Sequence, residues 1–527
     1  MVIRTRRGPR ISSVLAGLLL ALVAGALLLV GHPSLPSLEG RTVTSALSAE
    51  QAHATALGQA VEPLVAAHPD VSGLHPLGDP LAAFAARMVL ARHAERGIDA
   101  QYYIWQNDNT GTLLLGELER AARRGVRVRL LVDDNGIRGL DDTLAALAWE
   151  TNFEVRLFNP FTWRHPKWAN YLTAFSRLNH RMHNKSFTVD NQATIVGGRN
   201  IGDNYFAATD GVVFADLDVL AIGPVVSQVA REFDRYWASP LAYPIERIVN
   251  TPPADTLARL HARENQLADD PAAGAYRRAL AASGAVQHLY AGTAALTWAP
   301  ARMISDPPSK SLGKSAQGER LIDDLLPIFA ATTKSVELVS PYLVLGANGT
   351  RDLADMAQRG VDVRVLTNSL AATDVAAVHA GYSKRRKQLL AAGVKLYELP
   401  RTRGQPSDRE LAGAFGSSSS SLHAKTFAVD GECLFIGSFN FDPRSANLNT
   451  EMGFLIQSPI LAQSMRAAFE HEIPKRAYEV GVDADGHLYW LTERNGKVLR
   501  YDTEPDTTLG RRMAVSFLRL LPIDWLL

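Results

Sequence analysis

Two copies of one short pattern contain the side chains best suited to chemistry in this chain. Each copy reads His-x-Lys-x4-Asp-x6-Gly-x2-Asn. The residues are His183, Lys185, Asp190, Gly197 and Asn200 in the first copy, and His423, Lys425, Asp430, Gly437 and Asn440 in the second. Imidazoles act as nucleophiles and general acids, while ammonium and amide groups stabilise charge on phosphate oxygens. The pattern therefore predicts phosphoryl transfer.

The spacing also predicts how each copy folds. Side chains at i and i+2 of a strand share one face, so each histidine is expected beside its lysine. Asp190-Asn191 and Asp430-Gly431 are typical of two-residue hairpin turns. The turn accounts for both aspartates, which we interpret as structural rather than catalytic residues.

The hairpins determine what lies opposite each histidine. Turns at these positions place Gly198 opposite His183 and Ser438 opposite His423. Both residues are small, and the space beside them is expected to hold a phosphate. Gly198 and Ser438 are therefore candidate substrate-binding positions, and the motif asparagines fall on the same face as the histidines and lysines.

One such face is half of a site. Two faces related by a pseudo-twofold axis would supply two imidazoles, two ammonium groups and two amides to a single phosphodiester. One histidine attacks phosphorus and the other gives a proton to the departing alcohol; the next alcohol then reverses the roles. This scheme needs no metal and no cofactor.

Each catalytic histidine is expected to have a carboxylate on its other ring nitrogen, which fixes the tautomer. Glu451 stands 28 residues after His423 and is the candidate in the second half. For His183 the candidate is Asp216, 33 residues later, which requires a five-residue insertion.

The chain repeats itself. Residues 124–131 reappear as 359–366, and residues 155–160 as 395–400, at offsets of 235 and 240. Each half then shows a strand, a helix and a strand, at 98–105, 112–124 and 126–133, and at 335–340, 347–359 and 361–367. This alternation predicts an α/β fold with two pseudo-symmetric halves, each a mixed sheet flanked by helices, that share one active site.

The N-terminus carries a membrane signal. Residues 11–31 contain no charge, and 21 residues of helix span roughly 32 Å, the thickness of a bilayer core. Four arginines precede this run, so the positive-inside rule places the N-terminus in the cytoplasm and the catalytic part on the other side. The alternative is a cleaved signal peptide, but the small-x-small triplet Ala24-Gly25-Ala26 lies inside the apolar stretch, which favours an anchor.

These signals divide the chain. The predicted parts are a basic cytoplasmic N-terminus (1–10), a transmembrane anchor (11–31), a helical spacer (32–78), the first half (79–250), a connection (251–310), the second half (311–470) and a C-terminal extension (471–527).

Composition excludes some classes of function. The formal net charge is +1, which disfavours a nucleic-acid partner because phosphate-backbone binding needs a clear excess of Lys and Arg. The single cysteine, Cys433, permits neither an intrachain disulfide nor a cysteine-based metal site.

At these motifs the chain resembles the phospholipase D superfamily, whose mark is the duplicated His-Lys-Asp pattern. From about residue 75 to the end it is similar to bacterial cardiolipin synthases, most of all the C type. The segments that carry this similarity are Gln101–Trp105, Arg181–Phe187, Gly437–Ser445 and Leu521–Leu527.

The resemblance implies transfer of a phosphatidyl group from one phospholipid to the headgroup of phosphatidylglycerol, which gives cardiolipin at the bacterial inner membrane. Phosphatidylethanolamine is a candidate donor. In that family the histidine of one motif becomes phosphatidylated. By analogy His183 is the nucleophile and His423 the general acid, and the reverse order stays open.

Three other functions remain as alternatives. A phospholipase D would use water in place of the lipid alcohol and release phosphatidic acid, and the motifs are common to both reactions. A nuclease of the same superfamily is disfavoured by the charge and the anchor, and a non-catalytic scaffold by the intact motifs in both halves.

Two further segments have a composition typical of lipid interfaces. Trp163, Trp168, Tyr171 and Phe175 precede the first motif, and residues 511–527 mix apolar residues with arginines. Each segment either meets the membrane surface or packs on its own domain. The basic run 384–387 is interpreted as a solvated helix face.

Overall fold

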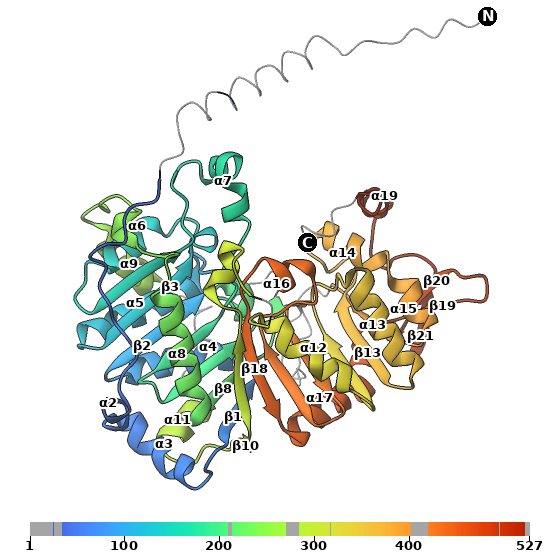
Figure 1. Ribbon diagram of the computed structural model, residues 1–527, viewed down its shortest axis with the longest axis horizontal. Helices are drawn as coiled ribbons and strands as arrows, with labels where there is room; N and C mark the ends of the chain where they lie inside the picture. Colours follow the sequence, from blue (N-terminus) through green and yellow to red (C-terminus); the bar gives the residue numbers. More distant parts are fainter. Residues whose placement is uncertain are drawn as a thin grey trace, which may run out of the picture.

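The computed structural model describes residue 25 and residues 34–208, 213–269, 284–316, 318–401, 420–494 and 496–521. Figure 1 shows two α/β halves side by side, the first from blue to green and the second from yellow to red. Each half contains a twisted sheet with helices packed against it, so the prediction of two halves with flanked sheets is confirmed.

Both sheets are mixed. The first has the strand order β10 (Thr297–Ala299), β1 (Ser72–Leu77), β8 (Asp218–Ile222), β6 (Ala193–Gly197), β5 (Ser186–Val189), β2 (Gly97–Tyr102), β3 (Arg127–Asp133), β4 (Phe153–Phe158) and β9 (Ala242–Pro244). The second has the order β11 (Ala301–Ser305), β18 (Met452–Gln457), β17 (Cys433–Gly437), β16 (Thr426–Val429), β12 (Ser335–Val339), β13 (Asp362–Asn368), β14 (Lys395–Leu399), β19 (Tyr478–Val482), β20 (Leu488–Arg494) and β21 (Lys497–Tyr501). In each sheet the three successive strands of the repeat, β2 to β4 and β12 to β14, are parallel.

The helices that cover the sheets also follow the repeat. Those of the first half are α2 (Ala49–His53), α3 (Ala56–Ala66), α4 (Pro80–His93), α5 (Asn109–Arg123), α6 (Asp141–Leu147), α7 (Tyr171–Leu178), α8 (Pro224–Trp237), α9 (Thr256–Asp269) and α11 (Gly284–Tyr290). Those of the second half are α12 (Leu321–Ala331), α13 (Gly346–Gln358), α14 (Ala376–Ser383), α15 (Arg386–Ala391), α16 (Pro443–Asn447), α17 (Pro459–His471), α18 (Ile473–Arg476) and α19 (Leu509–Leu518). The predicted helices at 112–124 and 347–359 correspond to α5 and α13. Each is followed by a glycine at positive φ, Gly125 at 96° and Gly360 at 93°, which reverses the chain into the next strand.

The two halves share an apolar core. Side chains of β6 and β8 pack with side chains of β17 and β18, among them Val196, Val219, Ile436 and Phe454. Each is at most 1% exposed, and burial of such a side chain contributes about 1.5–3 kcal/mol. The halves are therefore packed against each other as firmly as the interior of either half.

The connection between the halves is itself part of both sheets. Ala299 is the last residue of β10 and pairs with Ser72 in the first sheet. Ala301, two residues later, begins β11 and pairs with Ile456 in the second sheet. A single residue, Pro300, thus separates the sheets, which restricts their relative motion.

The segment predicted as a spacer differs from expectation. Helices α2 and α3 lie within it, but residues 72–77 form β1, which pairs with β8 and β10 inside the first sheet. Arg41 also donates hydrogen bonds to the carbonyls of Ala238, Ser239 and Ala242. Residues 41–77 are therefore part of the first half, because a strand partner and fixed backbone contacts hold them there.

The predicted anchor, residues 11–31, lies outside the described residues except for Gly25. Within the part of the chain that the structure describes, no helix has both the length and the apolar character required to cross a bilayer.

The two motif hairpins turn where expected but pair in a different register. Asp190, Asn191, Asp430 and Gly431 all have φ between 50° and 66°, the conformation of type I′ turns. The ladders then pair Val189 with Ala193, and Val429 with Cys433, so one further residue bulges out of each return strand. This extra residue shifts the register by one, and the predicted pairs His183–Gly198 and His423–Ser438 do not form.

The motif aspartates hold each hairpin to the neighbouring strand. The Asp190 carboxylate accepts hydrogen bonds from the backbone N–H groups of Glu95 (3.0 Å), Arg96 (2.8 Å) and Gly97 (3.0 Å), where β2 begins. Asp430 makes the same contacts with residues 333–335, where β12 begins. Both aspartates therefore lie far from the histidines and have structural surroundings.

Replacing Asp190 with alanine is expected to lower the free energy of unfolding by about 1–3 kcal/mol, because three backbone donors lose their acceptor. Asp430→Ala is the matched control and should cost less, since its partners Thr333 and Lys334 are exposed and can bond to water. Denaturant unfolding followed by tryptophan fluorescence measures both variants. Equal stability of Asp190→Ala and the parent protein would contradict this role.

Candidate active site

The two His-x-Lys segments lie at the boundary between the halves, just before their strands begin. β5 starts at Ser186 and β16 at Thr426, each one residue after the motif lysine. On the other side of each motif the chain pairs with the opposite half. Met182 forms a parallel bridge with Thr450, and β15 (Ser420–Leu422) runs parallel to β7 (Val213–Ala215).

Each histidine is bonded to a carboxylate of the other half. His183 Nδ1 lies 2.8 Å from Glu451 Oε2, and His423 Nδ1 lies 2.5 Å from Asp216 Oδ2. The sequence analysis identified both carboxylates but assigned Glu451 to His423 and Asp216 to His183, and this assignment is wrong. The pairs are crossed.

Inter-half backbone pairing explains the crossing. The backbone N–H of His183 donates to the carbonyl of Thr450 (2.9 Å), and that of His423 donates to the carbonyl of Ala215 (2.8 Å). The residue that follows each of these carbonyl groups is the carboxylate, Glu451 or Asp216. The bridge thus brings each carboxylate to the histidine of the opposite half.

The small residues next to the motif serve the carboxylates. Ser438 Oγ donates to Glu451 Oε2 at 2.5 Å. A side chain at Gly198 would place its Cβ only 2.1 Å from Asp216 Oδ1. The space beside both residues is therefore filled by a carboxylate rather than open, which corrects the reason given for Gly198 and Ser438 as substrate-binding positions.

The two carboxylates have different electrostatic surroundings. Burial raises the pKa of Glu451 to about 7, against the attraction of Lys185 and the hydrogen bonds from Ser438 and Ser445. Burial also acts on Asp216, but the attraction of His423 and Lys425 outweighs it and lowers the pKa of this carboxyl below its usual value. Asp216 is therefore ionised across the physiological range, whereas Glu451 titrates near neutrality.

The motif lysines are buried beside their histidines. Lys185 Nζ donates to the carbonyl of His183 at 2.6 Å, and Lys425 Nζ donates to the carbonyl of His423. Burial lowers the pKa of both ammonium groups, and the charge of Lys425 lowers the pKa of Lys185 further. Two buried ammonium groups beside two imidazoles form a site suited to a phosphate anion.

Both imidazoles belong to this same electrostatic group. Burial and then the charges of Lys185 and Lys425 lower the pKa of His183 well below its usual value. The pKa of His423 is lowered by burial and Lys425, but Asp216 opposes that shift. His183 is therefore the neutral imidazole, and His423 is the one paired with an ionised carboxylate.

The motif asparagines are both buried, with unequal partners. Asn200 accepts a hydrogen bond from the backbone of Ile104 and donates to Tyr205 Oη at 2.9 Å. Asn440 Oδ1 has no hydrogen-bond partner among the described residues. Tyr205 corresponds to Ser445 at the offset of 240, and the Ser445 hydroxyl accepts a hydrogen bond from the backbone N–H of Asn440 (3.3 Å).

Sequence reasoning missed the residues that position the motifs. Asp133, the last residue of β3, accepts from the backbone of Met182 (2.8 Å) and pairs with Arg181 (2.9 Å). Asn368, the last residue of β13, bonds to both backbone groups of Leu422. The sequence signal that could have identified these two residues is a polar residue at the end of a buried strand, which occurs in both repeats.

Tyrosines form the walls of the site and were also missed. The ring of Tyr103 meets His183 edge-on with centroids 5.1 Å apart, and Tyr205 meets His423 in the same way at 5.2 Å. Tyr342 follows β12 in the second half, and its hydroxyl donates to Asp374. Tyr103 also lines a hollow of about 260 Å³ together with Trp105 and Asn135, and none of the motif residues lines that hollow.

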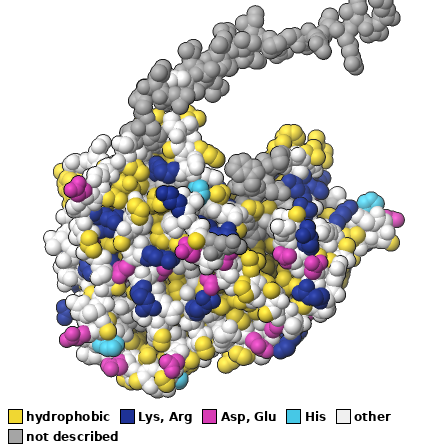
Figure 2. Space-filling model, in the orientation of Figure 1, with side chains coloured by type: hydrophobic (Ala, Val, Ile, Leu, Met, Phe, Trp, Pro, Cys, Tyr) yellow, Lys and Arg dark blue, Asp and Glu magenta, His cyan; other side chains and the backbone are white. Residues whose placement is uncertain are grey.

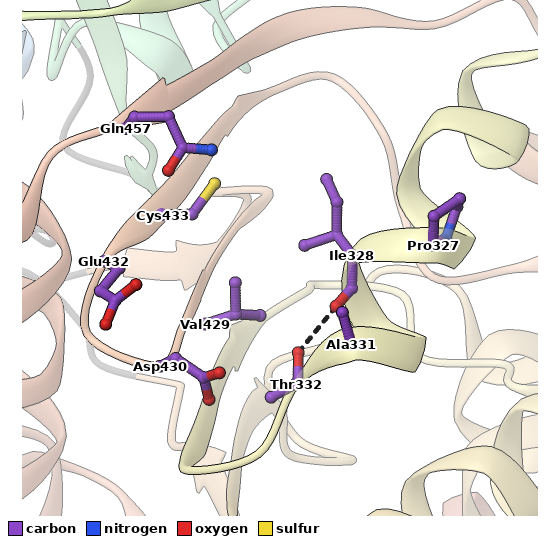
Figure 3. A pocket seen from close by; sticks show the side chains of 9 residues that line it. All are labelled: Pro327, Ile328, Ala331, Thr332, Val429, Asp430, Glu432, Cys433 and Gln457. Carbon is purple, nitrogen blue, oxygen red and sulfur yellow. Dashed lines mark hydrogen bonds between the residues drawn. The ribbon is translucent and has the colours of Figure 1, made fainter.

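A second hollow, of about 340 Å³, lies away from these residues. Figure 3 shows it between α12 and the turn of the β16–β17 hairpin, with Ile328 of α12 facing Val429 and Cys433. The hairpin turn at Asp430 is the end opposite to His423, so this hollow is separate from the candidate site.

Clusters with metal-ligand spacing lie elsewhere in the described residues. Glu119, His261 and Glu264 approach one another, but Glu119 is paired with Arg123 and Glu264 with Arg120. These ion pairs already balance the carboxylates.

Comparison with known proteins is consistent with this geometry. The family model described as cardiolipin synthase, phospholipase D-like domain, matches the chain twice, over residues 89–237 and 325–473. The chain belongs to this family. It is 46% identical over 471 residues to cardiolipin synthase C of Escherichia coli, covering 89% of this chain and 99% of the relative.

Other similar proteins are more distant. An uncharacterized protein of Helicobacter pylori is 31% identical over 487 residues, covering 89% of this chain and 92% of the relative. The crystal structure of phosphatidylserine synthase from Haemophilus influenzae superposes with a TM-score of 0.58 at 15% identity, covering 90% of this chain and all of that one, and so shows the fold alone. The chain is thus a phospholipase D-type enzyme of the cardiolipin synthase family.

For this family member, we expect activity to rise with pH through an inflection near 7, the pKa of Glu451. Above that pH the ionised carboxylate accepts a hydrogen bond from Nδ1–H of His183, and this tautomer leaves the lone pair of Nε2 available. Glu451→Gln should reduce kcat by about 100-fold and remove the inflection.

Asp216→Asn is the matched control for this pH profile. It also removes a charge next to a catalytic histidine, but the carboxyl that titrates near 7 remains. Its activity should fall while the inflection stays, and an inflection that persists in Glu451→Gln would contradict the assignment.

Proposed function

We propose that this enzyme makes cardiolipin by transferring a phosphatidyl group to the headgroup of phosphatidylglycerol through a phosphohistidine intermediate. His183 Nε2 forms a bond to phosphorus while the bond from phosphorus to the headgroup oxygen breaks. His423 gives its proton to the departing alcohol. In the second step His423 takes the proton of the acceptor hydroxyl, whose oxygen displaces His183 from phosphorus.

The observation that carries the proposal is the pair of crossed histidine–carboxylate contacts in one buried site. In each pair the carboxylate lies on Nδ1, which leaves Nε2 of both rings available for chemistry. Two such imidazoles in one site suit a double displacement, because one forms the covalent intermediate while the other moves the proton.

The charge of the site favours a phosphodiester. Lys185 and Lys425 are buried, and burial lowers the pKa of both ammonium groups although Asp216 and Glu451 oppose the shift. The negative charge of a bound phosphodiester would raise the pKa of His423 and favour its protonated form. The lysines then stabilise the negative charge that gathers on the non-bridging oxygens.

The inequality of the two pairs supports the assignment of roles. A nucleophile must be unprotonated, and the pKa of His183 is lowered well below its usual value. A general acid must carry a proton, and the attraction of the ionised Asp216 opposes the lowering of the His423 pKa by burial. His183 therefore suits attack and His423 suits proton transfer.

The identity of the acceptor separates two activities. Hydrolysis to phosphatidic acid would use the same intermediate and differ only in the second nucleophile. The similarity to a cardiolipin synthase C favours a lipid alcohol. We propose phosphatidylglycerol as acceptor, and phosphatidylglycerol or phosphatidylethanolamine as donor. We propose a position in the bacterial inner membrane, held by residues 11–31, with the catalytic part on the outer side.

Incubation of the purified protein with phosphatidylglycerol vesicles, with and without phosphatidylethanolamine, tests the reaction. Mass spectrometry should detect cardiolipin from the parent protein and none from His183→Ala or His423→Ala. More cardiolipin when phosphatidylethanolamine is present would identify it as a donor. Phosphatidic acid without cardiolipin would overturn the proposed acceptor.

A phosphatidyl ester of p-nitrophenol tests which histidine is the nucleophile. This leaving group departs without a proton, so His423→Asn should release one equivalent in a burst and then stall, because the acceptor cannot be deprotonated. His183→Asn should show no burst. A burst from His183→Asn alone would reverse the roles, and no burst from either variant would contradict the covalent step.

A further inference from the structure

Two exposed apolar patches lie on the same edge of the molecule, one in each half. Figure 1 places α7 and α19 together along the upper edge, with the blue end of the described chain beside α7. Figure 2 shows hydrophobic side chains gathered over both helices. We define the α7 patch as Trp168, Leu172 and Phe175, and the α19 patch as Leu509, Met513, Phe517 and Leu520.

The α7 patch is exposed although the segment that carries it is held in place by hydrogen bonds. Its side chains are 48–63% exposed, although the loop that carries them is firmly bonded. The Asn170 side chain bonds to the backbone of Thr162, Trp163 and Lys167. A loop held this tightly could bury its aromatic residues, so their exposure indicates a partner.

Charge near the α7 patch is already neutralised. Lys167 pairs with Asp134 at 3.0 Å, and Arg164 bonds to both Asp134 and Asp141. The patch therefore presents aromatic and aliphatic surface with little free charge, a composition suited to the interfacial zone of a bilayer.

Helix α19 has two different faces. Val515 packs on Leu370 and Ala380, which fixes one face to α14. Leu509, Met513 and Phe517 follow one another at i and i+4 on another face, and each is 63–65% exposed. The sequence left open whether this segment packs on its own domain or meets the membrane surface. The helix does pack on its own domain, and it still leaves an apolar stripe exposed.

Basic residues lie beside the α19 patch. Arg519 is exposed, and Arg512 lies at the helix surface. In the neighbouring run 384–387, Lys387 is exposed. Arg386 is only 2% exposed and is paired with Glu398, so the prediction of a solvated basic face is wrong for this residue. An apolar stripe flanked by arginines complements an anionic lipid surface.

Both patches connect to the walls of the active site. Tyr171 of α7 bonds to Asn135, which bonds to Tyr103 beside His183. In the second half, Arg511 of α19 donates to the carbonyl of Thr373 at 2.8 Å.

The residue after Thr373 is Asp374, the partner of Tyr342. Each patch is thus linked to the tyrosine of its own half. One patch belongs to each half, and the histidine–carboxylate pairs of the site form between the halves.

We infer that the α7 and α19 patches together dock the catalytic part on the surface of an anionic phospholipid bilayer, so that lipid headgroups enter the site between them. The inference rests on the proposed function, because it is the lipid substrate that requires such an approach. Docking itself is measured by binding, independently of catalysis.

Depth-dependent quenching tests the docking on the full chain in nanodiscs. A fluorophore is attached at Leu172→Cys, Met513→Cys or Val498→Cys; the native Cys433 is only 5% exposed, and the parent protein measures its background. Lipids with brominated acyl chains should quench the dye at 172 and 513 but not at 498, a position in β21 that is 71% exposed. Quenching should be stronger in discs of phosphatidylglycerol and phosphatidylcholine than in phosphatidylcholine alone.

Absence of quenching at 172 and 513 would overturn the inference. If light scattering then showed a dimer in detergent, a second copy of the chain would be the occupant of these patches. Quenching of equal strength in both kinds of disc would contradict the part played by the arginines.

Activity provides an independent test. The double variants Trp168→Asp/Leu172→Asp and Met513→Asp/Phe517→Asp should lose at least about tenfold in turnover of bilayer phosphatidylglycerol, the factor that about 1.4 kcal/mol produces. Both should keep parental turnover of monomeric short-chain phosphatidylglycerol. Val498→Asp/Leu499→Asp is the matched control and should retain activity on both.

The activity results separate the two proposals. A parent protein inactive on both substrates would contradict the proposed function and leave the quenching result standing. Equal loss on both substrates in the patch variants would contradict docking alone.

Discussion

The hydrogen bonds between each histidine and a carboxylate of the opposite half are the interactions on which the rest of the structure depends. His183 needs Glu451, and His423 needs Asp216, so neither half contains a complete catalytic pair. A shift of about 1 Å between the halves would break both contacts. The shared core of β6, β8, β17 and β18, and the single residue that separates the sheets at Pro300, keep the halves in register.

Burying these charges requires support from the surrounding residues. Asp306 accepts a hydrogen bond from the backbone of Glu451 and pairs with Lys310, which is itself almost fully buried. In the first half Arg199 donates to the carbonyl of Asp216. Each carboxylate residue is thus held by its backbone, and its side-chain oxygens bond the histidine and further donors, among them Ser438 and the backbone N–H of Leu217. An unsupported charge in this low-dielectric interior would cost several kcal/mol.

The duplicated halves supply the same reactive groups but give them unequal surroundings. One carboxylate has a pKa of about 7 and the other is ionised well below neutrality, because only Asp216 is attracted strongly enough to overcome its burial. A double displacement needs this inequality. One imidazole must begin as a nucleophile and the other as an acid, although both come from the same motif.

Much of this site could be read from the chain, because its signals are local. The spacing of His183 and Lys185, their repetition at 423 and 425, the alternation of strands and helices, and the Asp-Asn and Asp-Gly turns all depend on a few neighbouring residues. Even the two carboxylates were found, since each follows its motif at a similar distance. Periodicity and turn chemistry operate over such short ranges, so sequence alone determined the halves and their reactive side chains.

Only the tertiary structure decided how these groups meet. Which carboxylate serves which histidine depends on inter-half bridges at Thr450 and Ala215, and pairing between distant segments leaves no local pattern. The bulge after each turn shifts the register by one residue, which a hairpin signal does not encode. Asp133 and Asn368 act on backbone groups about 50 residues away, and the polar end of a strand does not reveal its partner. The sequence determined the chemical groups, and the docking of the two halves determined the active site, because contacts between remote segments exist only after folding.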